Sequence, residues 1–266
     1  MASWFPVSAQ TSSVRLVAFD LDDTLAPSKS ALDPRMGELL VELLDAVEVC
    51  VISGGNFGQF QSQLVENLPL DHPEALTRMH LMPTCGTQYY RFQEGAWVQQ
   101  YAENLTEEQK AAALAAVESE AKRLGFWEPD NSGVQVWGPV LEDRGSQITF
   151  SALGQAAPVD AKKAWDPTGE KKNTLRAAVQ QHLGDLEVRS GGSTSVDITR
   201  RGIDKAYGMR KLSQLTGIPF EQMLFVGDRL DPDGNDFPVI ALGIPTRAVE
   251  GWEDTAAVVE QFLASR

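Results

Sequence analysis

A short apolar segment that ends in two aspartates constrains the fold of this chain most. Residues 14–19 (VRLVAF) are almost continuously apolar over the length of one strand, and Asp20-Leu21-Asp22 follows directly. Such a run is typical of a strand buried on both faces, as in a parallel sheet covered by helices. Residues 47–53 (VEVCVIS) and 223–226 (MLFV) have the same character. The sequence therefore predicts a parallel sheet that contains these three segments.

Helical patterns lie between and after these strands. Asp33-Pro34 combines an N-cap residue with a proline at the first helical position, and apolar residues follow at helical spacing up to Val47. Further helices are expected over residues 57–64, near 205–215 and from about 253, with a short strand at 239–243 (VIALG). Strands that alternate with helices predict right-handed crossovers in a parallel sheet.

The middle of the chain has a different pattern. Residues 106–109 (TEEQ) have the form of a capping box and open an alanine-rich helix, and a further helix is expected within 164–183. Apolar and polar residues alternate in the expected strands, which are residues 134–140 (VQVWGPV), 146–153 (SQITFSAL) and 193–199 (STSVDIT). Such alternation is typical of an antiparallel sheet with one exposed face. We therefore predict an α/β protein with a Rossmann-like core, residues 1–98 and 201–266, and an inserted α+β domain, residues 99–200.

Charge and composition exclude several classes of partner. The chain has 266 residues and a formal net charge of −14, which would repel both nucleic acid and an anionic membrane. The N-terminal segment MASWFPVSAQTSS lacks the pattern of a signal peptide, and no apolar run has the length of a membrane span. We therefore expect a cytoplasmic protein with neither nucleic acid nor membrane as a partner.

Cysteine and histidine offer no sign of a metal site of their own. Cys50 stands in an apolar run, where a buried free thiol is expected, and Cys85 has no metal-ligand spacing to it. His72, His80 and His182 also lack ligand spacing, so we expect them on the surface or at helix ends.

Polar residues are placed where the predicted strands end. Asp20-x-Asp22 follows the first strand, Ser53-Gly54 ends the second, and Gly227-Asp228 ends the third. Ligands of open parallel sheets bind beyond the carboxyl ends of the strands. Lys205, at the start of a predicted helix, adds an ammonium group. Carboxylates, a hydroxyl and an ammonium at one edge are the groups that phosphoryl transfer from a monoester requires.

The chemistry of such a transfer gives these residues separate roles. A carboxylate such as Asp20 can attack phosphorus and form an aspartyl-phosphate, which divides one difficult step into two easier ones. The approach of two anions needs a cation, and Mg²⁺ prefers oxygen ligands, which Asp20, Asp228 and a backbone carbonyl near Asp22 can supply. Ser53 and Lys205 can hold the nonreacting phosphate oxygens. Asp22 would protonate the leaving alcohol and later activate water.

Together these motifs resemble the haloacid dehalogenase superfamily, in its phosphatase branch. The resemblance rests on FDLDDT, the VISGG turn, Lys205 and GDRLDPDGND, which span the chain in the family's order. It implies that Asp20 is the nucleophile and Asp22 the acid/base. It also implies that Ser53, with Gly54, and Lys205 bind phosphate. Finally, it implies that Asp228 and Asp236 bind Mg²⁺, with Asp20 and Asp22 completing the metal site.

The predicted insertion is similar to the cap of the α-type phosphomannomutases. The similarity lies in residues 142–151 (EDRGSQITFS) and 191–197 (GGSTSVD). In that family the cap binds the distal phosphate and the sugar, which implies substrate-binding roles for Arg144, Ser195 and Asp197. Two further arginines of the pattern are replaced here by Gln155 and Lys162. Lys162 is included among the substrate-binding candidates.

These departures decide which reaction the sequence favours. A mutase must hold a sugar bisphosphate at both ends, so a weaker cationic grip on the far phosphate favours simple hydrolysis. We therefore predict a Mg²⁺-dependent phosphatase of a small sugar phosphate, such as a hexose phosphate, that works through an aspartyl-phosphate. The alternative is a phosphomannomutase or phosphohexomutase that interconverts hexose 1- and 6-phosphates, and a noncatalytic phosphate-binding regulatory module ranks third. A homodimer would form through the cap.

Overall fold

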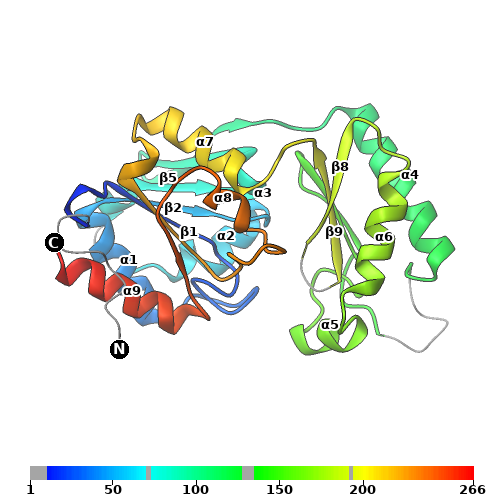
Figure 1. Ribbon diagram of the computed structural model, residues 1–266, viewed down its shortest axis with the longest axis horizontal. Coiled ribbons are helices and arrows are strands. Elements are labelled where there is room, and N and C mark those ends of the chain that lie inside the picture. The colour runs from blue at the N-terminus through cyan, green and yellow to red at the C-terminus, as the bar shows by residue number, and fades with distance from the viewer. Residues whose placement is uncertain (1–10, 70–72, 128–134, 192–193) are drawn as a thin grey trace. The chain divides into compact units, whose positions relative to one another are not determined.

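The computed structural model describes residues 11–69, 73–127, 135–191 and 194–266 of the chain (Figure 1). The chain divides into two compact units. The first comprises Met1–Tyr101 and Asp204–Arg266, and the second comprises Ala102–Ile203. The second unit is therefore an insertion into the first.

A mainly parallel sheet forms the centre of the first unit. Among the described residues it contains seven strands in the order β11-β10-β1-β2-β3-β4-β5, of which β11 to β3 run parallel and β4 is antiparallel to β3. The strands are β1 (Leu16–Phe19), β2 (Glu48–Ile52), β3 (Met79–Met82), β4 (Gln88–Gln93), β5 (Ala96–Ala102), β10 (Met223–Gly227) and β11 (Thr246–Ala248). This sheet confirms the predicted α/β class.

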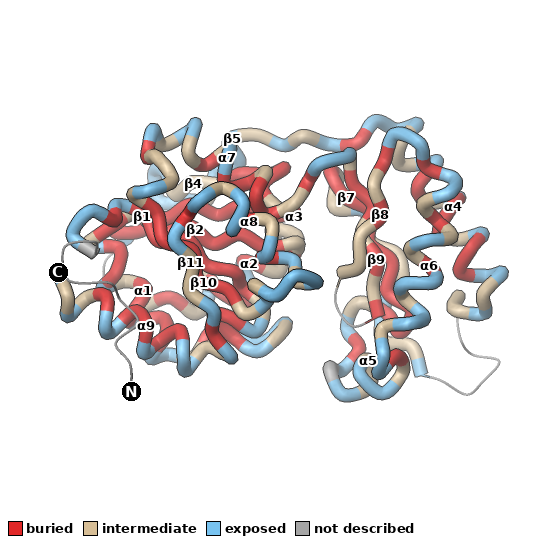
Figure 2. The backbone as a smooth tube through the Cα atoms, viewed as in Figure 1, coloured by how far each residue is buried: buried red, intermediate tan, exposed pale blue. Residues whose placement is uncertain are grey.

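Both faces of β1 are buried, as its apolar sequence predicts. The strand is buried along its whole length (Figure 2). Val17 and Phe19 lie in one hydrophobic cluster, whereas Leu16 and Ala18 lie in another. Successive side chains of a strand point to opposite faces, so the alternation places one cluster on each side of the sheet. A polar residue anywhere in this strand would therefore enter one of the two cores.

Helices complete the two clusters. Helices α1 (Pro34–Ala46) and α9 (Trp252–Ala264) contribute to the cluster that contains Phe19, and α7 (Lys205–Thr216) contributes to the other. The unit also contains α2 (Phe57–Gln63), α3 (Pro83–Gly86) and α8 (Phe237–Ile240). The predicted start of α1 is confirmed, because Pro34 is its first residue and the Asp33 side chain accepts a hydrogen bond from the Arg35 amide. The predicted helices over 57–64, 205–215 and from 253 are confirmed within two residues at each end.

The inserted unit is an antiparallel sheet packed against helices. In the described part of this unit, four strands pair in the order β6-β7-β9-β8. They are β6 (Leu141–Asp143), β7 (Gln147–Ser151), β8 (Leu186–Ser190) and β9 (Ser195–Arg200), and the helices are α4 (Glu107–Leu124), α5 (Val159–Trp165) and α6 (Glu170–Gln180). The predicted capping box is confirmed, since Thr106 and Gln109 bond each other's backbone amides at the start of α4.

The two faces of the inserted sheet differ in polarity. Ile148 and Phe150 of β7, with Val196 and Ile198 of β9, enter the hydrophobic cluster that the helices cover. The alternate residues of β7 are Gln147, Thr149 and Ser151, all of them buried. Buried polar side chains must be hydrogen-bonded or they cost free energy, so this second face is a candidate for a polar site.

The structure corrects the predictions at four points, which are two predicted strands, one group of missed strands and the burial of His80. Residues 239–243 are not a strand, because α8 and a turn occupy them and the strand follows at β11. Residues 135–140 form no strand, because Gly138 adopts a positive φ and Pro139 follows it. Val134 and Ser193, which were placed in predicted strands, lie outside the described residues. Strands β3, β4 and β5 were missed.

His80 is the fourth correction, because it is completely buried in β3 instead of exposed. Its Nδ1 forms a hydrogen bond with the Tyr89 hydroxyl at 2.8 Å, and its Nε2 pairs with Glu48. Burial lowers the pKa of His80, against the opposing effect of Glu48. The residue is therefore a hydrogen-bonded part of the core. His182 is exposed just after α6, His72 lies outside the described residues, and Cys50 is a buried free thiol as predicted.

Membrane insertion finds no support in the helices. Among the described residues, no helix combines the length and the apolar character needed to cross a bilayer.

Candidate active site

Three aspartates from separate parts of the first unit meet at one edge of its sheet. Within the described residues, Asp20, Asp228 and Asp236 each offer a carboxylate oxygen, and these oxygens lie within 4.8 Å of one another. Asp20 follows β1 and Asp228 follows β10, two neighbouring parallel strands, while Asp236 immediately precedes α8. The structure thus brings together three of the residues that the sequence assigns to a metal site.

Lys205 enters the same group from α7. Its Nζ lies 2.5 Å from Asp20 Oδ1 and 2.5 Å from Asp236 Oδ1, and the side chain is fully buried. Lys205 is the first residue of the helix, and the Asp204 side chain caps that helix by accepting from the Tyr207 amide at 2.8 Å. The cap fixes the first turn, so the lysine is directed to the carboxylates by the helix start.

Burial and charge shift the protonation of these groups strongly. Burial raises the pKa of Asp20 well above its usual range, against the opposing attraction of Lys205. Burial also raises the pKa of Asp228, and the negative charge of Asp236 adds to this effect. For Lys205, burial by itself would lower the pKa, but Asp20 and Asp236 more than offset it and the pKa is raised. The lysine is therefore held as a cation among the acids.

The backbone around this group leaves no space for larger residues. A Cβ at Gly227 would lie 2.3 Å from Asp236 Oδ2, so the glycine before Asp228 is required for Asp236 to approach. The same Oδ2 accepts a hydrogen bond from the Arg229 amide at 3.1 Å. On the other side, the Asp228 amide donates to the Thr24 hydroxyl at 3.1 Å, which ties the strand end to the loop after β1.

The composition of the group fits a divalent cation. Three carboxylates and one ammonium give a formal charge of −2 when all four are ionised. Hard oxygen ligands of this kind suit Mg²⁺, which is usually bound through one or two carboxylates with water in the remaining positions. The acidic group therefore matches the predicted cofactor in ligand type and in charge.

Magnesium binding should depend on Asp228. We expect Asp228→Asn to weaken the binding of Mg²⁺ at least about tenfold, since it removes an anionic ligand. Isothermal titration with MgCl₂ would measure the affinity. The matched control is Asp231→Asn, because Asp231 is exposed, lies in the same loop and pairs with Arg229. Equal affinities for the two variants would argue against the site.

Asp22 lies two residues after Asp20 in the sequence, but its carboxylate has other partners. Its Oδ1 accepts from the Lys29 amide at 2.8 Å and from Gln63 Nε2 at 3.1 Å, and its Oδ2 accepts from Gln59 Nε2 at 2.8 Å. The side chain is partly exposed, unlike that of Asp20. The Asp22 carboxylate does not belong to the three-aspartate group. A metal contact through a backbone carbonyl near Asp22 stays a prediction.

Ser53 and Gly54 lie at the same edge of the sheet. Phe19 pairs with Val51 on one side and with Val226 on the other, so the residues that follow each strand reach the edge together. Ser53 is buried, and its Oγ accepts a hydrogen bond from the Gly55 amide at 3.2 Å. The turn after β2 is thus ordered around the predicted phosphate-binding hydroxyl.

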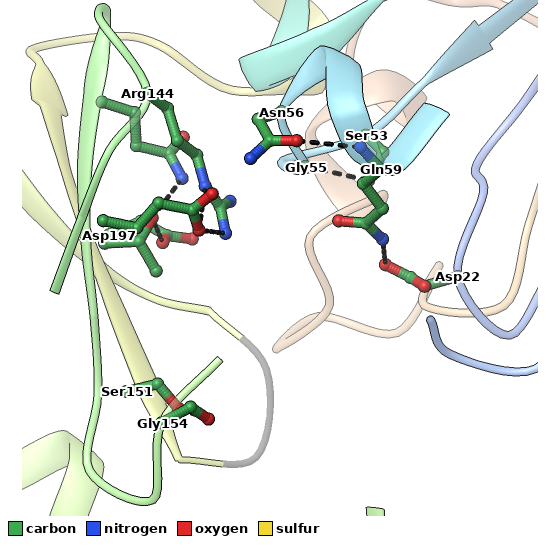
Figure 3. A network of polar contacts seen from close by, with 12 residues as sticks. Asp22, Ser53, Gly55, Asn56, Gln59, Arg144, Ser151, Gly154 and Asp197 are labelled. Carbon is green, nitrogen blue, oxygen red and sulfur yellow. Dashed lines mark hydrogen bonds and ion pairs between the residues drawn. The ribbon is translucent and has the colours of Figure 1, made fainter. Parts of the chain in front are cut away.

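The inserted unit gathers its own candidates on the polar face of its sheet. Asp197 Oδ1 accepts from the Thr149 hydroxyl at 2.7 Å, and burial raises the pKa of Asp197 while Arg144 opposes the shift. Arg144 follows β6 and pairs with Glu142 at 2.7 Å, with its side chain only 8% exposed (Figure 3). A Cβ at Gly191 would lie 2.7 Å from Ser195 Oγ and 2.8 Å from Asp197 Oδ2, so both side chains approach the backbone closely at this glycine.

Arg144, Ser195 and Asp197 therefore share one polar region of the inserted unit, whereas Lys162 lies on α5. Sequence reasoning did not identify Gln59, Gln63 or Thr24, although all three bond to predicted site residues. The spacing of Gln59 and Gln63, four apart just after the VISGG turn, was the signal available in the sequence.

Comparison with known proteins adds information that geometry does not give. Residues 36–265 match the family of eukaryotic phosphomannomutases. The chain is 26% identical over 274 residues to a probable phosphomannomutase of Caenorhabditis elegans, which covers 97% of this chain and 98% of that protein. It is 24% identical to phosphomannomutase 1 of Homo sapiens, over 85% of this chain and 83% of that protein.

Solved structures with the same fold are more distant in sequence. An IMP-nucleotidase of Plasmodium falciparum has a TM-score of 0.70 at 15% identity, over 97% of this chain and 71% of that one. A haloacid dehalogenase-like hydrolase of Bacteroides thetaiotaomicron has a TM-score of 0.61 at 14% identity, over 93% and 99%. At these identities the structural similarity supports the fold.

Proposed function

The chain belongs to the eukaryotic phosphomannomutase family, within the haloacid dehalogenase superfamily, and from this premise we propose that it is a Mg²⁺-dependent phosphohexomutase. The proposed reaction moves a phosphoryl group between the 1- and 6-positions of a hexose through an aspartyl-phosphate on Asp20. The observation that carries the proposal is the placement of Asp20, buried within 2.5 Å of the Lys205 ammonium and beside Asp228 and Asp236. We assign the catalytic role to the first unit and the recognition of the sugar to the inserted unit.

The first half of the reaction uses Asp20 and Asp22. An Asp20 oxygen attacks one phosphorus of a sugar bisphosphate, and the bond from that phosphorus to the ester oxygen breaks. Asp22 gives a proton to the departing sugar oxygen, so the products are a sugar monophosphate and a phosphorylated Asp20. Lys205 stabilises the negative charge on the transferring group because it is a buried cation next to Asp20. A bound Mg²⁺ would neutralise further charge between the carboxylates and the phosphate.

The second half transfers the phosphoryl group from Asp20 to the free hydroxyl of a sugar monophosphate, which forms the sugar bisphosphate again. Asp22 takes the proton of the attacking hydroxyl, the bond to Asp20 breaks, and the nucleophile is restored. A sugar bisphosphate is the intermediate, so the site must hold a phosphate at each end of the ligand. We assign the distal phosphate to Arg144, a cation of the inserted unit that lies beside Asp197 on the polar face of its sheet.

Hydrolysis is the second candidate, and one observation favours it. Gln155 and Lys162 stand where the phosphomannomutase pattern has arginines, so the distal phosphate would be held by fewer guanidinium groups. Arginine binds phosphate through two parallel hydrogen bonds, which neither glutamine nor lysine reproduces. A sugar monophosphate that escapes before the second transfer would leave the phosphorylated Asp20 open to water.

Product identification decides between the two reactions. We expect purified protein with Mg²⁺ and a catalytic amount of glucose 1,6-bisphosphate to convert mannose 1-phosphate or glucose 1-phosphate into the 6-phosphate. Phosphorus NMR would show the new ester with little inorganic phosphate. Accumulation of inorganic phosphate alone would replace the mutase by the hydrolase, and the absence of both products would reject the phosphotransferase proposal for these sugars.

A further inference from the structure

Two glutamines of α2 hold the Asp22 carboxylate through its side-chain oxygens. Gln59 Nε2 donates to Asp22 Oδ2 at 2.8 Å (Figure 3). Gln63 Nε2 donates to Asp22 Oδ1 at 3.1 Å. The Lys29 amide donates a third bond, to Oδ1, at 2.8 Å. A carboxylate with donors on both oxygens has a fixed rotation about its last torsion. This matters for a group that must present a proton in one direction.

The two glutamines act as a unit because of their spacing. Residues four apart in a helix lie on one face, and Gln59 Nε2 also donates to Gln63 Oε1 at 3.0 Å. The Asn56 side chain caps α2 by accepting from the Gln59 amide at 2.8 Å, so the helix start is fixed as well. Gln63 is 2% exposed, and a buried amide that bonds a carboxylate is an unusual choice for a packing position.

The turn after β2 makes room for this arrangement. A Cβ at Gly55 would lie 2.3 Å from Gln59 Oε1 and 2.8 Å from Gln59 Cδ. The Gly55 amide also donates to Ser53 Oγ. The same glycine therefore orders the predicted phosphate-binding hydroxyl and leaves the space that Gln59 needs to reach Asp22. The Ser53 hydroxyl and the Asp22 carboxylate are thus connected through the turn after β2 and the Gln59 side chain.

We propose that Gln59 and Gln63 are positioning residues, which hold the Asp22 carboxylate in the orientation required for proton transfer to and from the sugar hydroxyl. This inference rests on the proposed function, since it assumes that Asp22 is the acid/base. It assigns no contact with substrate to either glutamine. The proposal differs from a purely structural role, in which the amides would only fasten the loop after β1; Gln63 does also donate to the Pro27 carbonyl, at 3.5 Å.

The leaving group of the substrate separates these two roles. We expect Gln59→Leu to lower kcat/KM for the active hexose phosphate by about 10- to 100-fold, because a misplaced proton donor loses much of its effect. The loss should be several-fold smaller for 4-nitrophenyl phosphate, whose leaving group needs little protonation. The matched control is Gln61→Leu, since Gln61 is exposed on the same helix, and it should retain wild-type kcat/KM for both substrates.

A double-mutant cycle gives a second, independent test. In the Asp22→Asn background, we expect Gln59→Leu to cause no further loss, because the group that Gln59 positions is already inactive. Gln63→Leu should behave in the same way. Thermal unfolding of each variant would show that the comparison is made between folded proteins.

The outcomes distinguish this inference from the proposed function. Wild-type protein without phosphotransfer to or from any hexose phosphate would reject the function itself. Active wild-type protein with Gln59→Leu equal to Gln61→Leu would reject only the positioning role. Two further results would also reject the positioning role. One is a loss of kcat/KM in Gln59→Leu that is equal for both substrates, and the other is a loss that adds fully to the loss caused by Asp22→Asn. A loosened loop would produce either result.

Discussion

Asp20→Asn should remove catalysis almost completely, by about 10⁴-fold or more in kcat, while the protein stays folded. The substitution keeps the size of the side chain but exchanges the nucleophilic carboxylate for a neutral amide. The Lys205 ammonium loses one of its two carboxylate partners and keeps Asp236 at 2.5 Å. Measurement of kcat with a hexose phosphate would test activity, and intact-protein mass after brief mixing with glucose 1,6-bisphosphate would test phosphorylation.

Asp23→Asn is the matched control for this prediction. Asp23 is exposed, lies three residues along the same loop and has a φ of 59°, a conformation that asparagine tolerates. Its carboxylate accepts a hydrogen bond from the Ser28 amide, which an asparagine oxygen can also accept. We therefore expect nearly wild-type activity from Asp23→Asn. Turnover by Asp20→Asn that comes close to that of this control, with mass labelling intact, would exclude Asp20 as the nucleophile.

The core of the fold was predictable because its strands are buried on both faces. Leu16 to Phe19 must be apolar at every position, since each side of the sheet is covered, and few other structures permit such a run. The run at residues 239–243 has no such constraint. Pro238 in the first turn of α8 favours a helix there, and a short apolar run fits a helix as well as a strand.

The strands that sequence reasoning missed contain polar residues with distant partners. His80 interrupts the apolar pattern of β3, and its bonds come from Glu48 and Tyr89, which lie 32 and 9 residues away. Only the pairing of β2, β3 and β4 brings these residues together. Local periodicity therefore underestimates a strand whose polar residues are satisfied across the sheet.

The candidate site shows the same division between local and distant information. The meeting of Asp20 with Asp228 was predictable, because neighbouring parallel strands end at one edge. The hydrogen bond between Asp22 and Gln59 was not predictable, because two glutamines four residues apart are common on a solvated helix. The path of the loop after β1 decides it, including the positive φ of Asp23, and no periodic pattern encodes that path.

Lys205→Met is expected to cost both stability and activity. The substitution removes the buried cation between Asp20 and Asp236 and leaves their carboxylates facing each other. Loss of one member of a buried charge group costs about 3–5 kcal/mol of unfolding free energy. Loss of the positive charge beside the transferring phosphoryl group should lower kcat by at least about 10²-fold. Denaturant unfolding in EDTA and steady-state kinetics with Mg²⁺ would measure the two effects.

The pH dependence of this stability loss follows from the acids that remain. Burial already raises the pKa of Asp20 and Asp228 in the folded protein, and removal of Lys205 takes away the attraction that opposes it. A carboxyl whose pKa is higher in the folded than in the unfolded state binds protons preferentially when folded, so it destabilises the fold less as the pH falls. The gap between Lys205→Met and wild type should therefore narrow from pH 8 towards pH 5 in EDTA.

Added Mg²⁺ should narrow the same gap at pH 8, because a divalent cation can replace part of the missing positive charge. The control is Lys211→Met on the same helix, where the ammonium is partly exposed and lies 5.3 Å from the centre of the Tyr101 ring. A cation–π contact of that kind contributes about 1 kcal/mol or less, with no reason to respond to Mg²⁺. A Lys205→Met protein as stable in EDTA as the Lys211→Met control would show that Lys205 does not hold these carboxylates together.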